Sequence, residues 1–325
     1  MRWTDIVIDH TGYQDAALRQ HKLERNLRLL EQDAQDHPED PFTLFNLGWT
    51  KLDVGRSEEA YKHLQESLQR STPDSSIVRK LYDLLGHASR MLGQSDEERQ
   101  WVEKGLALFP DDCELLLHRA MIETDRHNPT GAIQALEQLL ASRPTRYFGS
   151  MDEGSRGYRT RHRLAELYRD QARTVEAELQ WRTALAEQPG FIPARLGLGE
   201  LFLEQRRWAE VAAMAEGLEQ VCGDAVNAEV MRCRLLVAQS EFATARRRIS
   251  DLIERFPDLV GPRILLTHLL LREGKDWKAA AVALRQVLRL ERGHAEANHN
   301  LSLLLRNHPE LASPVCEGNE DRPSP

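Results

Sequence analysis

The most basic stretch of the chain lies between Arg156 and Arg169, and its residue types could bind an anion. Within it, Arg159, His162 and Arg169 recur at a spacing that places them on one side of a helix. Arginine binds phosphate or carboxylate through paired hydrogen bonds, so a phosphate or an acidic peptide is a possible ligand. Arginine alternating with acidic residues is more typical of a solvent-exposed helix face, and we favour that interpretation.

The sequence gives less support for catalysis or metal binding. The sequence contains none of the motifs Gly-x-Gly-x2-Gly, Gly-x4-Gly-Lys-Ser/Thr, His-Glu-x2-His or Gly-x-Ser-x-Gly. Its 12 histidines show no ligand spacing, so we interpret each as a surface or packed residue and predict no catalytic residue, no metal and no cofactor. The pair Asp111-Asp112 suits the start of a helix, where carboxylates favour the unpaired N–H groups.

Composition narrows the function classes further. The chain has 325 residues and a formal charge of −8, which argues against nucleic acid as a partner. It has no apolar run long enough for a membrane span. The cysteines show no Cys-x2-Cys pairing, so we predict a reduced, cytoplasmic protein whose cysteines are small core residues; they are Cys113, Cys222, Cys233 and Cys316.

The elements that must position these residues are helices. Between positions 164 and 189, small and large apolar residues follow the spacing of two short antiparallel helices closed by a proline, at Leu164, Ala165, Tyr168, Ala177, Trp181, Ala184 and Pro189. The small residues allow the two helices to cross closely, and Pro189 stops the second helix. Such a unit cannot bury its apolar face alone, so it predicts copies of itself.

Copies recur along most of the chain. The small residue of the first helix returns mostly every 34 residues, at Gly48, Gly86, Ala120, Ala165, Gly199, Cys233, Thr267 and Ser302. The small residue of the second helix returns at Ala60, Ala132, Ala177, Ala245 and Ala280. Glycine marks the turn between the helices at Gly55, Gly93 and Gly274. This pattern is the tetratricopeptide signature, so we predict an all-α fold: an α-solenoid of about seven helix-turn-helix units forming a right-handed superhelix.

The ends and one interval depart from the repeat. We expect 1–14 to be the remnant of an upstream domain, with a short strand at Ile6–Ile8, and 15–40 to be a connecting helix. Repeats 1–3 then occupy 41–144, an inserted loop 145–157, and repeats 4–7 residues 158–292. We expect a capping helix at 293–309 and a disordered tail at 310–325.

The concave side of such a solenoid is lined by the first helix of each pair. In the first repeat this side carries Phe42, Phe45, Trp49 and Leu52, an apolar patch. The patch could hold a partner peptide or pack on the preceding helix, and we favour packing. The candidate partner-binding residues are therefore Phe42, Phe45 and Trp49 in the first repeat, with Arg159, His162 and Arg169 in the fourth.

Other motifs resemble a particular family. The run Asp5–Tyr13 is followed by Lys22-x2-Arg25-Asn26 and Pro41-Phe42-x2-Phe45-Asn46-Leu47-Gly48; Tyr147, Ser150-Met151-Asp152, Gly154 and Tyr158 then precede the fourth repeat. Together these residues resemble bacterial family 2 glycosyltransferases with a C-terminal tetratricopeptide tail. The resemblance implies a catalytic domain with an Asp-x-Asp metal motif before residue 5. We assign no catalytic role to His10 without that motif.

Two functions follow. We favour a non-catalytic tetratricopeptide scaffold that mediates protein–protein interaction, with a protein or peptide on its concave face or an upstream glycosyltransferase domain as partner. The alternative is the C-terminal part of a split or truncated family 2 glycosyltransferase, which acts in glycosyl transfer only with an upstream catalytic domain.

Overall fold

The computed structural model describes residues 16–142 and 153–312, and every regular element in these ranges is helical. The strand predicted at residues 6–8 lies outside them, as do residues 145–152 of the expected inserted loop and residues 313–325 of the tail. The chain divides into two compact units, unit 1 with residues 1–173 and unit 2 with residues 174–325.

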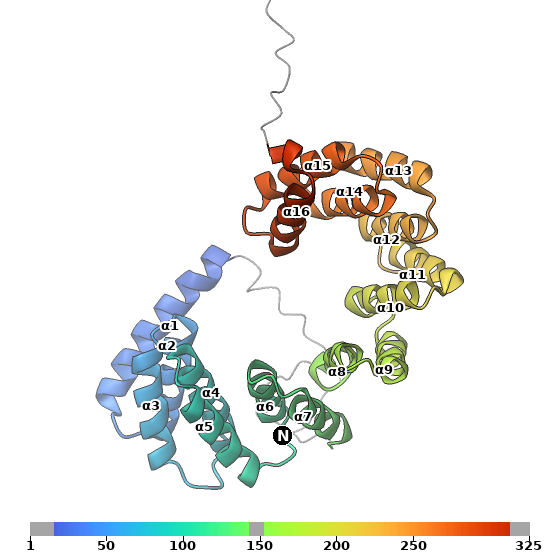
Figure 1. The fold of residues 1–325 in the computed structure, drawn as a ribbon. Helices are drawn as coiled ribbons and strands as arrows, with labels where there is room; N and C mark the ends of the chain where they lie inside the picture. The colour runs from blue at the N-terminus through green and yellow to red at the C-terminus, as the bar shows by residue number, and fades with distance from the viewer. Residues whose placement is uncertain (1–15, 143–152, 313–325) are drawn as a thin grey trace, which may run out of the picture. The chain divides into compact units, whose positions relative to one another are not determined.

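The helices of each unit follow one another at short intervals (Figure 1). Unit 1 contains α1 (Ala16–Asp36), α2 (Pro41–Asp53), α3 (Ser57–Arg70), α4 (Val78–Met91), α5 (Ser95–Leu108), α6 (Cys113–Asp125), α7 (Pro129–Ala141), the 3₁₀ helix η1 (Glu153–Arg156) and α8 (Tyr158–Asp170). Unit 2 contains α9 (Thr174–Glu187), α10 (Ile192–Glu204), α11 (Trp208–Gln220), α12 (Ala225–Ala238), α13 (Phe242–Arg255), α14 (Val260–Glu273), α15 (Trp277–Leu290), α16 (Ala295–Asn307) and the 3₁₀ helix η2 (Pro309–Ala312).

Neighbouring helices pack as the predicted pairs. In unit 1, α2 packs on α3, α4 on α5 and α6 on α7; in unit 2, α10 packs on α11 and α14 on α15 (Figure 1). The small residues of the second helices, Ala60, Ala132, Ala177, Ala245 and Ala280, are all fully buried. A larger side chain at these positions would separate the helices, so the predicted repeat phase is confirmed.

The turn inside each pair has a left-handed residue. Gly55, Gly93 and Gly274 have φ of 80°, 73° and 67°, as their glycines predicted. Four further residues take the same conformation with φ between 55° and 66°: His127, Ala172, Arg206 and Ser240. Successive turns thus repeat at the intervals found for the small residues, although only three of them contain glycine.

Helix starts are capped locally. Asp112 accepts a hydrogen bond from the backbone N–H of Leu115 at 2.9 Å, which confirms the predicted helix start. At the other end of the array, Leu304 of α16 is buried, and Arg285 donates a hydrogen bond to the carbonyl of Leu311 at 2.6 Å. The last helix therefore closes the apolar core of unit 2, and η2 continues it to residue 312.

Candidate functional site

A pocket of about 440 Å³ lies in unit 1 along the first helices α4, α6 and α8. We call it the α6–α8 groove. Its lining consists of Arg90, Ala120, Met121, Thr124, Asp125, Leu136, Arg163, Glu166, Leu167, Arg169 and Asp170. All but Leu136 belong to first helices of the predicted pairs, which is the side that the sequence assigns to the concave face.

The groove combines apolar and charged surfaces. Ala120, Met121, Leu136 and Leu167 supply apolar contact area. Three arginines and three carboxylates supply the charge, and one such pair, Arg90 with Asp125, forms an ion pair between α4 and α6. Such a surface suits a ligand that carries both apolar and charged side chains, as an extended peptide does.

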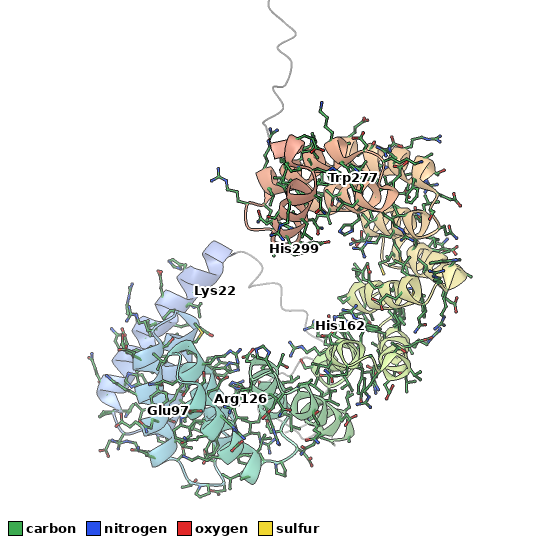
Figure 2. All side chains as sticks on the ribbon, in the orientation of Figure 1. Lys22, Glu97, Arg126, His162, Trp277 and His299 are labelled. Carbon is green, nitrogen blue, oxygen red and sulfur yellow. The ribbon has the colours of Figure 1, made fainter. Side chains whose placement is uncertain are left out.

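The groove includes only one of the three predicted basic-repeat residues. Arg169 is part of its lining, whereas Arg159 and His162 are not. His162 lies on α8 (Figure 2), where its Nε2 is 3.5 Å from Glu166 Oε1. Desolvation by burial lowers the pKa of His162. The Arg159 guanidinium lies 5.6 Å above the Tyr158 ring. Of these three residues Arg169 alone lines the groove, and their role in binding a partner stays a prediction.

The aromatic patch of the first repeat is divided between core and surface. Phe45 is buried among residues of α3 and α4, and its ring lies 6.2 Å from Phe42 and 5.6 Å from Trp49. Phe42 and Trp49 keep 46% and 40% of their surface exposed. The Lys80 ammonium lies 5.5 Å from the Trp49 ring. Phe45 is thus a core residue, whereas Phe42 and Trp49 present surface to a partner.

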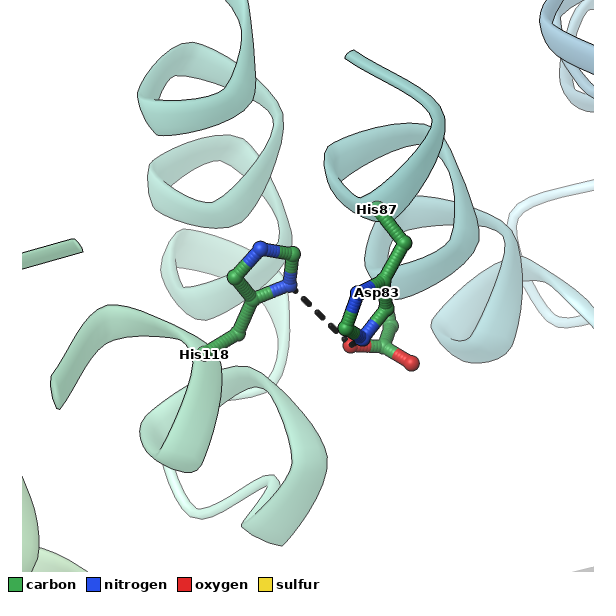
Figure 3. A group of neighbouring side chains, drawn as sticks. All are labelled: Asp83, His87 and His118. Carbon is green, nitrogen blue, oxygen red and sulfur yellow. Dashed lines mark hydrogen bonds and ion pairs between the residues drawn. The ribbon is translucent and has the colours of Figure 1, made fainter. Parts of the chain in front are cut away.

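A second polar group lies inside the packing of α4, α5 and α6. We call it the His118 cluster; it consists of Asp83 and His87 from α4, Glu98 from α5 and His118 from α6. His118 Nδ1 is 3.3 Å from Asp83 Oδ1, and its Nε2 is 2.9 Å from Glu98 Oε1. Figure 3 shows His118 facing Asp83 and His87 across the two helices. The His87 and His118 rings stack with centroids 4.2 Å apart.

Gly86 makes room for this cluster. A Cβ atom at Gly86 would lie 2.7 Å from His118 Cε1, closer than real contacts allow. Glu98 occupies the position at which five other repeats bury alanine, yet only 5% of its surface is exposed. Gly86 on α4 and Glu98 on α5 therefore both accommodate the imidazole of His118.

The charges around the cluster favour the ionised form of Asp83. Desolvation raises the pKa of Asp83, but the hydrogen bond with His118 and the charges of Lys80 and His87 outweigh it, so the pKa lies well below its usual range. Lys80 Nζ is 3.0 Å from Asp83 Oδ2 and 2.6 Å from Glu114 Oε1. Desolvation by burial raises the pKa of Glu114.

Asp83, His87 and His118 each offer a metal-ligand atom, and these atoms lie within 4.8 Å of one another. Residue spacing did not predict this group, because the two histidines are 31 positions apart on different helices. Two signals were present: Asp83 and His87 share a helix face at i,i+4, and Glu98 interrupts the series of alanines.

The comparisons with known proteins identify the fold. No protein-family model and no curated protein matches the sequence. A tetratricopeptide repeat protein from Parabacteroides merdae superposes with a TM-score of 0.61 at 17% identity, over 82% of this chain and 98% of that one. Yeast Tom70 gives a TM-score of 0.53 at 14% identity, over 93% of this chain and 63% of that one. The Cut9–Hcn1 hetero-tetramer of the APC/C gives 0.51 at 10% identity, over 91% and 57%.

The matches to known structures and the spacing of the small residues indicate the same fold. The described chain is a helical solenoid with the tetratricopeptide fold, as the residue spacing predicted. None of its described helices is both long enough and apolar enough to cross a membrane. The resemblance to a glycosyltransferase tail stays a prediction.

Proposed function

We propose that this protein is a non-catalytic scaffold that binds an extended protein segment in the α6–α8 groove, on the concave side of the solenoid. The groove itself carries this proposal. It joins about 440 Å³ of space with apolar side chains and both signs of charge, along helices of successive repeats. The related fold of Cut9, which assembles with Hcn1, adds support for a protein partner.

Met121 is the central residue of the proposed interaction. It lies on α6, between the groove residues of α4 and those of α8, and is partly exposed. A flexible thioether side chain adapts to many apolar partners, so a bound segment would place an apolar side chain there. Arg169 would then pair with a carboxylate of the same segment.

The test begins with random linear peptides displayed on phage and selected against the full-length chain. The affinity of an enriched peptide is then measured for the wild type, for Met121→Glu and for Leu108→Glu. We expect Met121→Glu to weaken binding roughly tenfold or more, because it places a charge against the buried apolar anchor. Leu108, 58% exposed on α5 and outside the groove, is the matched control and should leave the affinity unchanged.

Two outcomes would contradict the proposal. One is equal affinity of the enriched peptides for Met121→Glu and wild type, which would place the binding site elsewhere. The other is that selection enriches no peptide against the wild type. In the first case the aromatic pair Phe42 and Trp49 becomes the next candidate surface.

The second candidate function is glycosyl transfer together with an upstream catalytic domain. Its support is the sequence resemblance, much of which falls on residues 5–13 and 147–152, outside the described ranges. The scaffold function implies no turnover of nucleotide sugars by the purified chain. Measurable transfer or hydrolysis would favour the enzymatic alternative.

A cytoplasmic location is the third part of the proposal, and the cysteines support it. The described residues contain no disulfide. Burial raises the pKa of Cys113 to about 11 and that of Cys233 to about 12. These two thiols therefore stay protonated and behave as small core residues.

A further inference from the structure

We propose that the His118 cluster is a binding site for a divalent transition metal of the zinc class, which joins α4 to α6. The ligand atoms are Asp83 Oδ1, His87 Nε2 and His118 Nδ1. Imidazole and carboxylate ligands together suit zinc, cobalt and nickel. The three ligand residues lie outside the lining of the α6–α8 groove, although Arg90 and Asp125 of the surrounding charge network belong to it, and the proposal does not depend on peptide binding.

Two of the three ligand pairs have separations that fit tetrahedral coordination; the third requires His87 to turn, because its ring stacks on that of His118 with the centroids 4.2 Å apart. Zinc lies about 2.0–2.1 Å from histidine nitrogen and carboxylate oxygen, so two ligand atoms of a tetrahedral site are about 3.3 Å apart. Asp83 Oδ1 is 3.3 Å from His118 Nδ1 and 3.5 Å from His87 Nε2. Both pairs thus lie close to the edge length of a coordination tetrahedron.

Glu98 orients the central histidine. Both ring nitrogens of His118 face a carboxylate, Nε2 that of Glu98 at 2.9 Å and Nδ1 that of Asp83 at 3.3 Å. With a metal bound, Glu98 accepts the hydrogen bond from Nε2–H, and Nδ1 carries the lone pair that binds the ion. A neutral imidazole has one N–H, yet carboxylates lie at both of its nitrogens. A metal ion bound between His118 and Asp83 would take the place of a proton in that second contact. A carboxylate behind a ligating histidine is the usual outer-shell partner in metal sites.

The surrounding charges favour a dication. Among the described residues, ion pairs link four carboxylates to two cations, Lys80 and Arg90; the carboxylates are those of Asp83, Glu98, Glu114 and Asp125. With neutral imidazoles this network of four negative and two positive groups has a net charge of −2. Lys80 binds the other oxygen of Asp83, Oδ2, so Oδ1 remains directed at the two histidines.

His87 provides the entry side. Its side chain is 41% exposed, whereas those of Asp83 and His118 are 4% and 1% exposed. The metal would approach past His87, and a water molecule could occupy the fourth position. His87 is also the ligand most able to turn its ring. This rotation would bring its Nε2 closer to His118 Nδ1.

The experiment uses the full-length chain without an affinity tag and stripped of metal by chelation. Added Co²⁺ should give the visible absorption bands of a nitrogen- and oxygen-coordinated ion at one equivalent, and Zn²⁺ should displace them. We expect His87→Gln to weaken Zn²⁺ binding roughly tenfold or more, with unchanged circular dichroism because His87 is partly exposed. Zn²⁺ should raise the Tm of the wild type and much less that of His87→Gln.

His268→Gln is the matched control. His268 is comparably exposed and lies 2.7 Å from a single carboxylate, that of Glu296, so its loss should not change Zn²⁺ affinity. Glu98→Gln tests the positioning role: we expect roughly 10–100-fold weaker binding with the cobalt bands retained. The proposal is overturned if the wild type gives no cobalt bands, or if it and His87→Gln bind Zn²⁺ equally. The cluster would then be a metal-free hydrogen-bond network.

Discussion

His63 connects the stability of the first repeats to pH. Its Nε2 lies 3.2 Å from the ammonium of Lys51, whose side chain is only 7% exposed and also contacts Glu59 at 2.6 Å. Desolvation and then the charge of Lys51 lower the pKa of His63 below its usual 6.5. The folded state therefore favours the neutral imidazole, which accepts a hydrogen bond from Lys51.

A depressed histidine pKa makes stability fall on acidification. The contribution of His63 is present above the unfolded value of 6.5 and is lost as pH falls through the lower, folded value. We expect Tm to drop between about pH 7.5 and about pH 5.5, and to drop less in His63→Gln. His87 and His162, whose pKa values are also lowered by desolvation, should contribute to the loss that remains. An equally steep drop in wild type and variant would contradict this assignment.

Site residues were predictable from the sequence only where the repeat position determines the surroundings. Arg169 lines the groove because its repeat position faces the same side as Met121. Phe45 was assigned to the same side but is buried, because its ring reaches into the core formed by α3 and α4. The His118 cluster depends on the packing of three helices against one another, and no local spacing encodes that arrangement.

At the scale of the element, small residues at helix crossings hold the repeats together. Gly197 on α10 is buried, and a Cβ atom there would lie 2.4 Å from Cε2 of Trp181 on α9. Trp181 itself is fully buried, so its ring can move aside only by displacing the core residues around it. The usual preference of a helix for alanine is therefore reversed at this position.

Gly197→Ala should destabilise the protein despite its better helix propensity. Propensity alone would add about 1 kcal/mol, whereas overpacking a tight core costs about 1–3 kcal/mol, so we expect a net loss. Gly261→Ala on α14 is the control, because no atom lies within 4 Å of its added Cβ. Denaturant unfolding checks both variants. A Gly197→Ala protein as stable as Gly261→Ala would show that the contact with Trp181 relaxes freely.

The sequence predicted the positions of the helices better than it predicted the residues in the turns between them. The phase of the small residues correctly placed the helix pairs, and Gly55, Gly93 and Gly274 marked three turns. The turns at Ala172 and Arg206 gave no such signal, since these residues adopt φ > 0 against their intrinsic preference. The packing of the flanking helices imposes that conformation, so only the repeat interval predicts it.

At the scale of the whole molecule, the repeat array presents several surfaces, and we assign peptide binding to unit 1. Unit 2 has a pocket of about 230 Å³ near α12 and α13, lined largely by charged residues such as Arg232, Arg248 and Asp251. Both pockets include six charged and four apolar residues, but the α6–α8 groove is nearly twice as large, and its size is the reason for this assignment. The sequence predicted the tetratricopeptide fold but could not rank these two surfaces, because it does not reveal which side chains enclose space.

The most direct test of peptide binding in the groove is amide hydrogen exchange of the full-length chain with and without a peptide enriched by selection. Binding in the groove should slow exchange in α6 and α8, residues 113–125 and 158–170, because the bound segment lowers the frequency of local opening there. We predict that this protection is largest in these two helices and is lost in Met121→Glu. Protection confined to helices α9–α16 of unit 2 would contradict the proposed site.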